Sequence, residues 1–461
     1  MRLFSISVGA PLVCGVALGV LAADRAFTSY AGAKPALDQP GDLLPSDLRN
    51  PNEAKWNAWS RRQDKAIRAR LQQGDLDSMV NLLLYGTSFT KQPRIKVEAF
   101  AEASKAGVLR ARVDDLVAGL RSPGDNERLT FLNGLLRRQR IDSSSPGETG
   151  VFIYNNLQRV LQEMGTLAKR GEEAKRLIKP DVVPPDVVPD PAAIFNWRPG
   201  LLRDRGVSLD TGIFPNFSIE QALRDLKNRG VLREGQVARV AVIGPGLDFS
   251  DKNEQASFDY YPQQTLQPFA LYDSLVRLGL ARANAVSMSI FDISPRVIDH
   301  LQRARERARN NTGYVIQLPR EVAPPWPADL VAFWRSLGDR VGAEVAPITP
   351  PNVFRDLETR AVRIRPDVVL TLQPVDLNIV LERMNLAESD RFDLMVATNI
   401  FIYYDAFERS LALENAGAML KRGGILLTND RLPEVPGGSM RQAGLTDVQY
   451  NHDSVGWYRK R

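Results

Sequence analysis

The chain has 461 residues, 44% hydrophobic and 25% charged, so it is long enough for two or three domains of ordinary globular composition. This composition argues against wholesale disorder and against a protein with many membrane spans. The formal charge is +6, but the 60 basic and 54 acidic residues are interspersed without a recognised nucleic-acid module, which argues against a nucleic-acid partner.

Residues 1–23 have the composition of a secretory signal. Arg2 precedes an apolar run, and the small residues Ala22 and Ala23 follow it, which predicts export with cleavage near Ala22. The run is also close to the roughly 20 residues that a bilayer span requires, so an uncleaved membrane anchor is the alternative. Removal of the leader would remove Cys14, the only cysteine, which suits an oxidising compartment. We therefore predict a periplasmic, secreted or membrane-anchored protein.

The next part of the chain divides by composition. Residues 24–50 are rich in Ala, Pro, Gly and Asp without periodicity, which predicts a tether. Residues 51–172 carry apolar side chains at helical spacing and predict an all-α domain, with Trp56 and Trp59 expected in its core rather than on a binding surface. Residues 173–200 contain two consecutive Pro-Asp-Val-Val-Pro sequences, and such proline density predicts an extended linker.

Residues 201–461 alternate between strand and helix patterns. Strands are predicted at about 237–243, 285–291, 367–373, 393–398 and 424–429. The helical patterns between them include 267–280, 295–309 and 406–420. Repeated β-α units predict a parallel sheet with helices on both faces, which is a Rossmann-like, doubly wound α/β fold.

Glycines and an acidic residue follow the first two predicted strands. The first strand leads into Gly244-Pro245-Gly246-Leu247-Asp248, and glycine lets the backbone pass close to a ligand at the carboxyl edge of the sheet. The second strand ends in Asp292, with Ile293 after it, and a carboxylate there can accept both hydroxyls of a ribose. The alternatives are a purely structural turn at the glycines and an aspartate that only caps or solvates a loop.

These two elements together resemble class I S-adenosylmethionine-dependent methyltransferases, in which a glycine loop follows the first strand and a ribose-binding acid ends the second. The run 391–405, which contains Asn399, is similar to the fourth-strand segment of the chemotaxis-receptor glutamate methyltransferases. By the same resemblance, Asp376 and Leu377 stand where the family contacts adenine. The implied cofactor site comprises Gly244, Pro245, Gly246, Asp248, Asp292, Ile293, Asp376, Leu377 and Asn399.

The resemblance implies S-adenosylmethionine as cofactor and methyl transfer to an unknown acceptor, a carboxylate if the fourth-strand likeness extends to the substrate. It also implies a C-terminal antiparallel hairpin formed by 443–450 and 455–458. Positioning can supply most of the catalysis of methyl transfer, so no catalytic side chain is named. With only two histidines, no metal site is predicted.

Several residues depart from the family pattern. Val242 replaces the usual acid before the glycine turn, and Asp248 replaces the third glycine. Insertions at 251–264 and 313–351 are either surface loops or parts of a substrate site. The alternative function is a noncatalytic binding or scaffold protein of the cell envelope whose helical domain engages a protein partner. A nicotinamide-dependent oxidoreductase would need a third glycine where Phe249 stands. Export also conflicts with the cytosolic supply of S-adenosylmethionine.

Overall fold

The computed structural model of the chain describes residues 24–39, 43–95, 100–178, 212–249, 259–323, 325–351, 357–448 and 454–461. The predicted leader at 1–23 and most of the predicted linker at 173–200 lie outside these ranges. Within the described part of the chain, no helix has the length and apolar character needed to cross a membrane.

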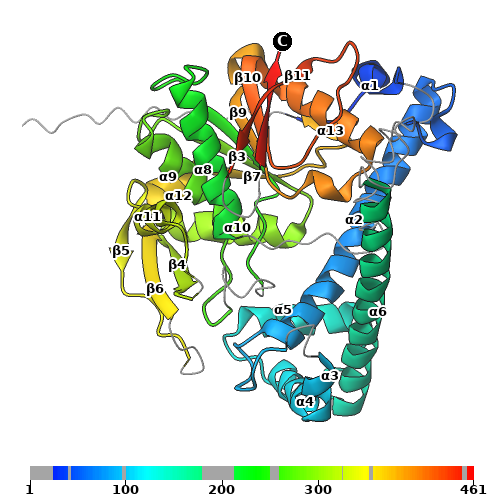
Figure 1. Cartoon of the computed structure of the whole chain (residues 1–461), viewed down its shortest axis with the longest axis vertical. Coiled ribbons are helices and arrows are strands. Elements are labelled where there is room, and N and C mark those ends of the chain that lie inside the picture. The colour runs from blue at the N-terminus through cyan, green and yellow to red at the C-terminus, as the bar shows by residue number, and fades with distance from the viewer. Residues whose placement is uncertain are drawn as a thin grey trace, which may run out of the picture.

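A seven-stranded sheet forms the centre of the C-terminal half (Figure 1). Its strands are β2 (Arg239–Ile243), β3 (Ser287–Asp292), β7 (Leu372–Asp376), β9 (Phe392–Ala397), β10 (Leu420–Thr428), β11 (Met440–Asp447) and β12 (Ser454–Lys460). They lie in the order β11-β12-β10-β9-β2-β3-β7. β12 is antiparallel to both of its neighbours, β10 and β11, and all other pairings in the sheet are parallel. The Rossmann-like sheet and the C-terminal antiparallel hairpin are therefore confirmed.

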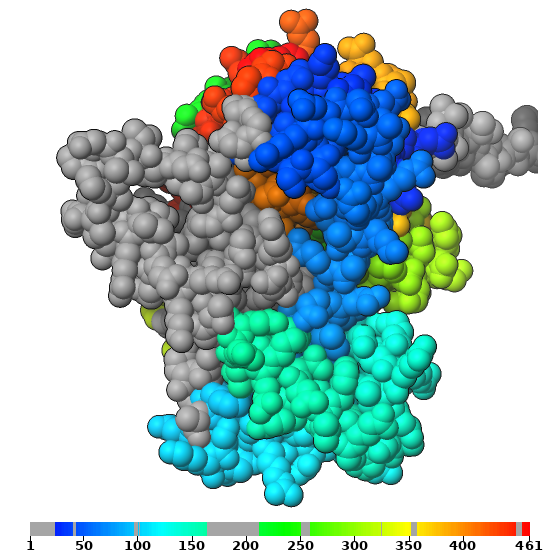
Figure 2. All heavy atoms as spheres, turned by 90° about the vertical axis from the view of Figure 1, so that its right-hand side faces the viewer, coloured from blue at the N-terminus to red at the C-terminus, as the bar shows by residue number. Residues whose placement is uncertain are grey.

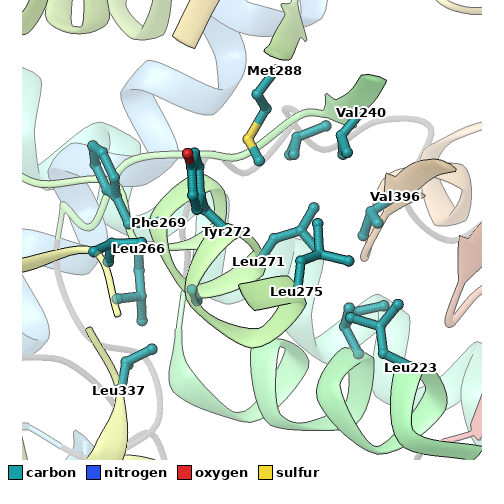
Figure 3. Close-up of a cluster of buried hydrophobic side chains, with 14 of the residues drawn as sticks. Leu223, Val240, Leu266, Phe269, Leu271, Tyr272, Leu275, Met288, Leu337 and Val396 are labelled. Carbon is teal, nitrogen blue, oxygen red and sulfur yellow. The ribbon is translucent and has the colours of Figure 1, made fainter. Parts of the chain in front are cut away.

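Alternate residues of the central strand pack into different cores. Val240 and Val242 belong to one buried cluster, whereas Ala241 and Ile243 belong to a second. Successive side chains of a strand point to opposite faces, so both faces of β2 are covered. The covering elements are α8 (Ile213–Asn228), α9 (Gln267–Arg277), α10 (Pro295–Arg309), α12 (Pro366–Thr371) and α13 (Ala406–Met419). Figure 3 shows Leu271 and Leu275 of α9 in the first cluster, near Val240.

One local prediction in this half is wrong. The strand predicted at 367–373 is helix α12 followed by β7, because Pro366 starts the helix and apolar residues cover only part of its surface. The insertion at 313–351, for which the sequence allows either a surface loop or part of a substrate site, contains secondary structure in its described residues. Its elements are β4 (Tyr314–Glu321), α11 (Ala328–Ser336) and β5 (Gly342–Val345), which join β6 (Leu357–Ile364) in an antiparallel sheet of order β4-β6-β5.

The predicted all-α region is helical. It contains α2 (Glu53–Tyr85), α3 (Phe100–Lys105), α4 (Val108–Arg121), α5 (Glu127–Arg138) and α6 (Pro146–Ile178). Its core includes Leu83, Leu116 and Leu132, all fully buried. The 33-residue helix α2 serves both halves of the molecule, because its first half joins the sheet domain's second cluster and its last turns join the helical core. Figures 1 and 2 show α2 as the column that connects the two regions.

Part of the predicted tether at 24–50 packs against the sheet domain. Strand β1 (Arg25–Phe27) pairs antiparallel with β8 (Glu382–Met384), and α1 (Tyr30–Leu37) lies against α13. Ala33 and Ala36 of α1 are fully buried. The short helices η1 (Ser46–Leu48), η2 (Glu388–Asp390) and η3 (Phe401–Tyr403) complete the secondary structure of the described residues. The small alanine side chains let α1 pack closely against α13, so this part of the predicted tether is not a free chain.

Candidate functional site

The glycine turn follows β2 at the carboxyl edge of the sheet. Gly244 and Gly246 have φ angles of 63° and 69°, a left-handed region that favours glycine. The amide of Gly244 donates to the carbonyl of Phe291 at 2.7 Å, which fixes the turn to the neighbouring strand β3. A Cβ at Gly244 would lie 2.1 Å from Cδ1 of Ile400. The backbone conformation therefore favours glycine at position 244, and any side chain there would also displace the end of the Ile400 side chain.

We expect Gly244→Ala to lower the free energy of unfolding by about 1–3 kcal/mol, from left-handed strain together with the contact with Ile400. The matched control is Gly230→Ala, because Gly230 has a φ of 68° but open space around its Cα. Urea unfolding of both variants separates the two costs. Equal losses in the two variants would show that the contact with Ile400 contributes nothing.

Asp292 ends β3 beside the glycine turn. Its residue is 5% exposed, and Oδ1 accepts a hydrogen bond from the amide of Ser294 at 2.8 Å. Burial raises the pKa of this carboxyl to about 7, while hydrogen bonds from the amides of Ser294 and Ile293 oppose the shift. A carboxyl with a pKa near neutrality thus lies next to the glycine turn. Ile293 is itself 9% exposed and follows at the same edge.

Asp376 ends β7 and lies opposite Asp292 in the strand register. Two arginines from the N-terminal segments hold it. Arg68 of α2 donates to Oδ1 at 2.8 Å, and Arg25 of β1 donates to the carbonyl at 2.6 Å and lies 3.2 Å from Oδ2. The next residue, Leu377, is buried, and its amide donates to the carbonyl of Asp292 at 3.1 Å. The structure therefore brings Asp292, Asp376 and Leu377 to one edge.

Asn399 follows β9 and adopts a φ of 56°. Its amide donates to Oδ1 of Asn429 at 2.8 Å, and Nδ2 of Asn429 donates back to the Asn399 side chain at 2.8 Å. This pair joins the carboxyl ends of β9 and β10. Asp405, further along the same segment, forms a capping box with Glu408 and so begins helix α13.

Asp248 lies in the contact between the two regions rather than in an open ligand site. Its side chain is 4% exposed, lies 3.6 Å from the guanidinium of Arg128, and accepts from the amide of Gln264 at 2.8 Å. Burial raises the pKa of Asp248 to about 8, and Arg128 opposes that shift. The helical-domain partner Arg128 was not found from sequence, because no local pattern links residues 120 positions apart.

A cleft of about 780 Å³ separates α2 and α5 from the start of α10. The residues that follow Asp292, from Ile293 to Pro295, line one wall, and Leu71, Gln72 and Phe131 line the other. The glycine turn, Asp292, Asp376 and Asn399 do not line this cleft. A second cleft of about 700 Å³ lies between α8, α11 and the end of β11 and contains none of the predicted site residues.

In the described ranges, no group of three or more His, Cys, Asp or Glu side chains is arranged so that it could hold a metal ion. His300 is buried, with Nε2 2.8 Å from the hydroxyl of Tyr314. Burial and nearby arginines lower its pKa to about 4. This histidine is a neutral core residue at physiological pH.

No family model and no curated protein matches the chain. Among solved structures, it is similar to N-methyltransferase NodS from Bradyrhizobium japonicum WM9 in complex with S-adenosyl-L-homocysteine, at 13% identity, covering 52% of this chain and 85% of that chain, with a TM-score of 0.25. A TehB-like SAM-dependent methyltransferase from Corynebacterium glutamicum shows 11% identity, 53% and 98% coverage and a TM-score of 0.25. MtNAS in complex with MTA and tNA shows 9% identity, 76% and 96% coverage and a TM-score of 0.24. With scores this low, the fold assignment rests on strand order and register.

Proposed function

We propose that the sheet domain binds S-adenosylmethionine at the carboxyl edge of β2 and β3 and transfers its methyl group to an acceptor. The supporting observation is that the Gly244–Gly246 turn and Asp292 end adjacent parallel strands. From β2 the sheet extends to β3 on one side and to β9 on the other, so the turn lies where the strand order reverses. Ligands of open α/β sheets bind outside the carboxyl ends of strands at such a point.

The residues at this edge suit the chemistry of the cofactor. Gly244 already donates its amide to the carbonyl of Phe291, and Pro245 has no amide hydrogen, so Gly246 is the residue of the glycine turn whose amide can approach the methionine carboxylate. The Asp292 carboxylate can accept hydrogen bonds from the ribose hydroxyls. Ile293 and Leu377 offer apolar contact to adenine. The cofactor supplies an activated methyl group, and the chain orients it and excludes water, so no proton-transfer residue is assigned.

Calorimetric titration of the chain lacking residues 1–23 with S-adenosylmethionine and S-adenosylhomocysteine tests the proposal. We expect micromolar binding of both compounds. If the protein binds neither S-adenosylmethionine nor S-adenosylhomocysteine, the proposed function is overturned. Release of S-adenosylhomocysteine in the presence of small carboxylic acids, amines and phenols then identifies the acceptor class, with a carboxylate proposed first from the likeness of the segment around Asn399.

The proposed location is outside the cytosol, with the leader either removed or retained as an anchor. This proposal rests on the composition of residues 1–23. Cell fractionation with N-terminal sequencing tests it. A soluble cytosolic protein that retains Met1 would contradict export and would also remove the conflict with the cytosolic supply of the cofactor.

A second candidate function is a noncatalytic scaffold whose helical domain binds a protein partner. The contact between Ile400 and Gly244 favours it, because a side chain already occupies the space over the glycine. Titration with the cofactor separates the two functions, since the scaffold binds neither S-adenosylmethionine nor its product.

A further inference from the structure

One arginine of the helical domain reaches the backbone that continues from the glycine turn. Arg128, in the first turn of α5, is 2% exposed. Its Nε donates to the carbonyl of Phe249 at 2.6 Å and Nη2 to that of Asp248 at 3.2 Å, while Nη1 donates to the carbonyl of Tyr261. Two stretches of chain lie between β2 and α9: the outgoing arm, residues 244–249, and the returning arm, residues 259–266. The single guanidinium of Arg128 therefore binds carbonyl groups of both arms.

Other helical-domain groups hold the returning arm. The carboxylate of Asp259 accepts from the amide of Thr87 at 2.7 Å, from its hydroxyl at 2.6 Å and from the amide of Ser88 at 3.0 Å. Glu127 accepts from the amide of Gln263 at 3.0 Å. These contacts come from the loop that follows α2 and from the start of α5, so two parts of the helical domain hold residues 259–264.

Side-chain packing also attaches the outgoing arm to the helical domain. The ring of Phe249 is 1% exposed, belongs to the helical-domain core and lies edge-on to Phe131 with a centroid distance of 5.6 Å. Asp248 and Gln264 close the arms on each other, because each amide donates to an oxygen of the other residue, at 3.0 and 2.8 Å. Asp248 is only two residues beyond Gly246, so these restraints act directly next to the turn.

Buried carbonyl groups need hydrogen-bond donors, and leaving them without donors costs free energy. A guanidinium offers five donors in a planar fork, whereas an ammonium is a compact group that cannot reach several separated carbonyls together. The conformation of this segment therefore depends on an arginine at position 128 and not only on a positive charge opposite Asp248.

We infer that Arg128 is a positioning residue for the cofactor site and that the helical domain is a working part of that site rather than a separate module. This inference rests on the proposed function. It assigns the helical domain to holding the backbone after Gly246 in the conformation that receives the cofactor.

The test compares Arg128→Lys with Arg137→Lys, an exposed arginine on the same helix. Three measurements are made on each protein: titration with S-adenosylmethionine, hydrogen exchange of peptides covering 244–249 without ligand, and thermal unfolding. We expect Arg128→Lys to bind at least tenfold more weakly and to exchange faster at 244–249, with Arg137→Lys unchanged. Thr87→Val, which removes one donor to Asp259, should show a smaller change and serves if Arg128→Lys does not fold.

The outcomes separate the inference from the proposed function. A folded Arg128→Lys protein with unchanged affinity and unchanged exchange at 244–249 would overturn the positioning role. If Arg128→Lys does not fold, unchanged affinity and exchange in Thr87→Val would overturn it as well. If residues 244–249 exchange faster in Arg128→Lys but the wild type does not bind the cofactor either, the result supports the restraint on the turn by Arg128 and overturns the proposed function.

Discussion

Asp292→Asn is expected to weaken binding of S-adenosylmethionine by at least about 100-fold at pH 8. A hydrogen bond to a charged group contributes roughly 1.5–3 kcal/mol, and the carboxylate can accept two from the ribose. Since about 1.4 kcal/mol corresponds to tenfold in affinity, losing both corresponds to two decades or more. The asparagine keeps the shape and one acceptor oxygen, so the hydrogen bond from the Ser294 amide is retained. Calorimetric titration measures the change.

The pKa of Asp292 also predicts that cofactor affinity depends on pH. The pKa of Asp292 is about 7, so its carboxylate form, which accepts the ribose hydroxyls, becomes dominant between pH 6 and pH 8. Cofactor affinity should therefore rise across this window in the wild type and stay flat in Asp292→Asn. Affinity that does not change with pH in the wild type would contradict a ribose contact at Asp292.

The contribution of Asp292 to the free energy of unfolding should fall as the pH rises, whereas the cofactor affinity should increase. Because folding raises the pKa of Asp292 from 3.8, the protonated form favours the folded state. The contribution of this group to stability is complete below pH 3.8 and is lost as the pH rises toward 7. The carboxylate that would bind the cofactor is thus held at a cost to the fold. Urea unfolding of wild type and Asp292→Asn between pH 5 and 8 measures this contribution, since other groups titrate in both proteins.

The central strands could be predicted because most of their residues are buried and many are apolar. β2 is apolar and buried after Arg239, and β3 is buried after Ser287. The glycine that follows β2 and the aspartate that ends β3 mark the carboxyl edge of the sheet. Period alone does not distinguish a short apolar helix from a strand, which is why the sequence predicts a strand at 367–373 although residues 366–371 form helix α12. Pro366 was the available signal, since proline favours the first position of a helix.

The residues that surround the site could not be predicted. Arg68 reaches Asp376 across 308 positions, and Arg128 reaches Phe249 across 121. Nothing in the local sequence of an arginine on a helix reveals a distant carboxylate or carbonyl partner. The same limit applies to Arg25, which lies in a segment without periodicity and is ordered by pairing with β8. Tertiary pairing, rather than local pattern, determines these positions.

Trp56→Ala is expected to lower the free energy of unfolding by about 3–5 kcal/mol, the range for truncating a large buried aromatic. Trp56 is fully buried, stacks on Trp59 with a centroid distance of 5.4 Å, and donates from Nε1 to the carbonyl of Thr28 at 2.7 Å. Trp59 in turn meets Phe407 of α13 edge-on. Urea unfolding measures the loss. Trp56→Phe is the matched control, since it keeps a ring but removes the indole donor.

Trp56→Ala should also weaken the contacts at the proposed cofactor site, because α2 is one continuous helix. Trp56 anchors its first half to the sheet domain, and Arg68, about three turns later, contacts Asp376. Loosening that anchor frees the N-terminal segment that carries Arg25 as well, so both arginines at Asp376 lose their support. We therefore expect Trp56→Ala to raise the Kd for S-adenosylmethionine at a temperature where the variant is still folded. An unchanged Kd would show that Asp376 is held by Arg68 without help from the first half of α2.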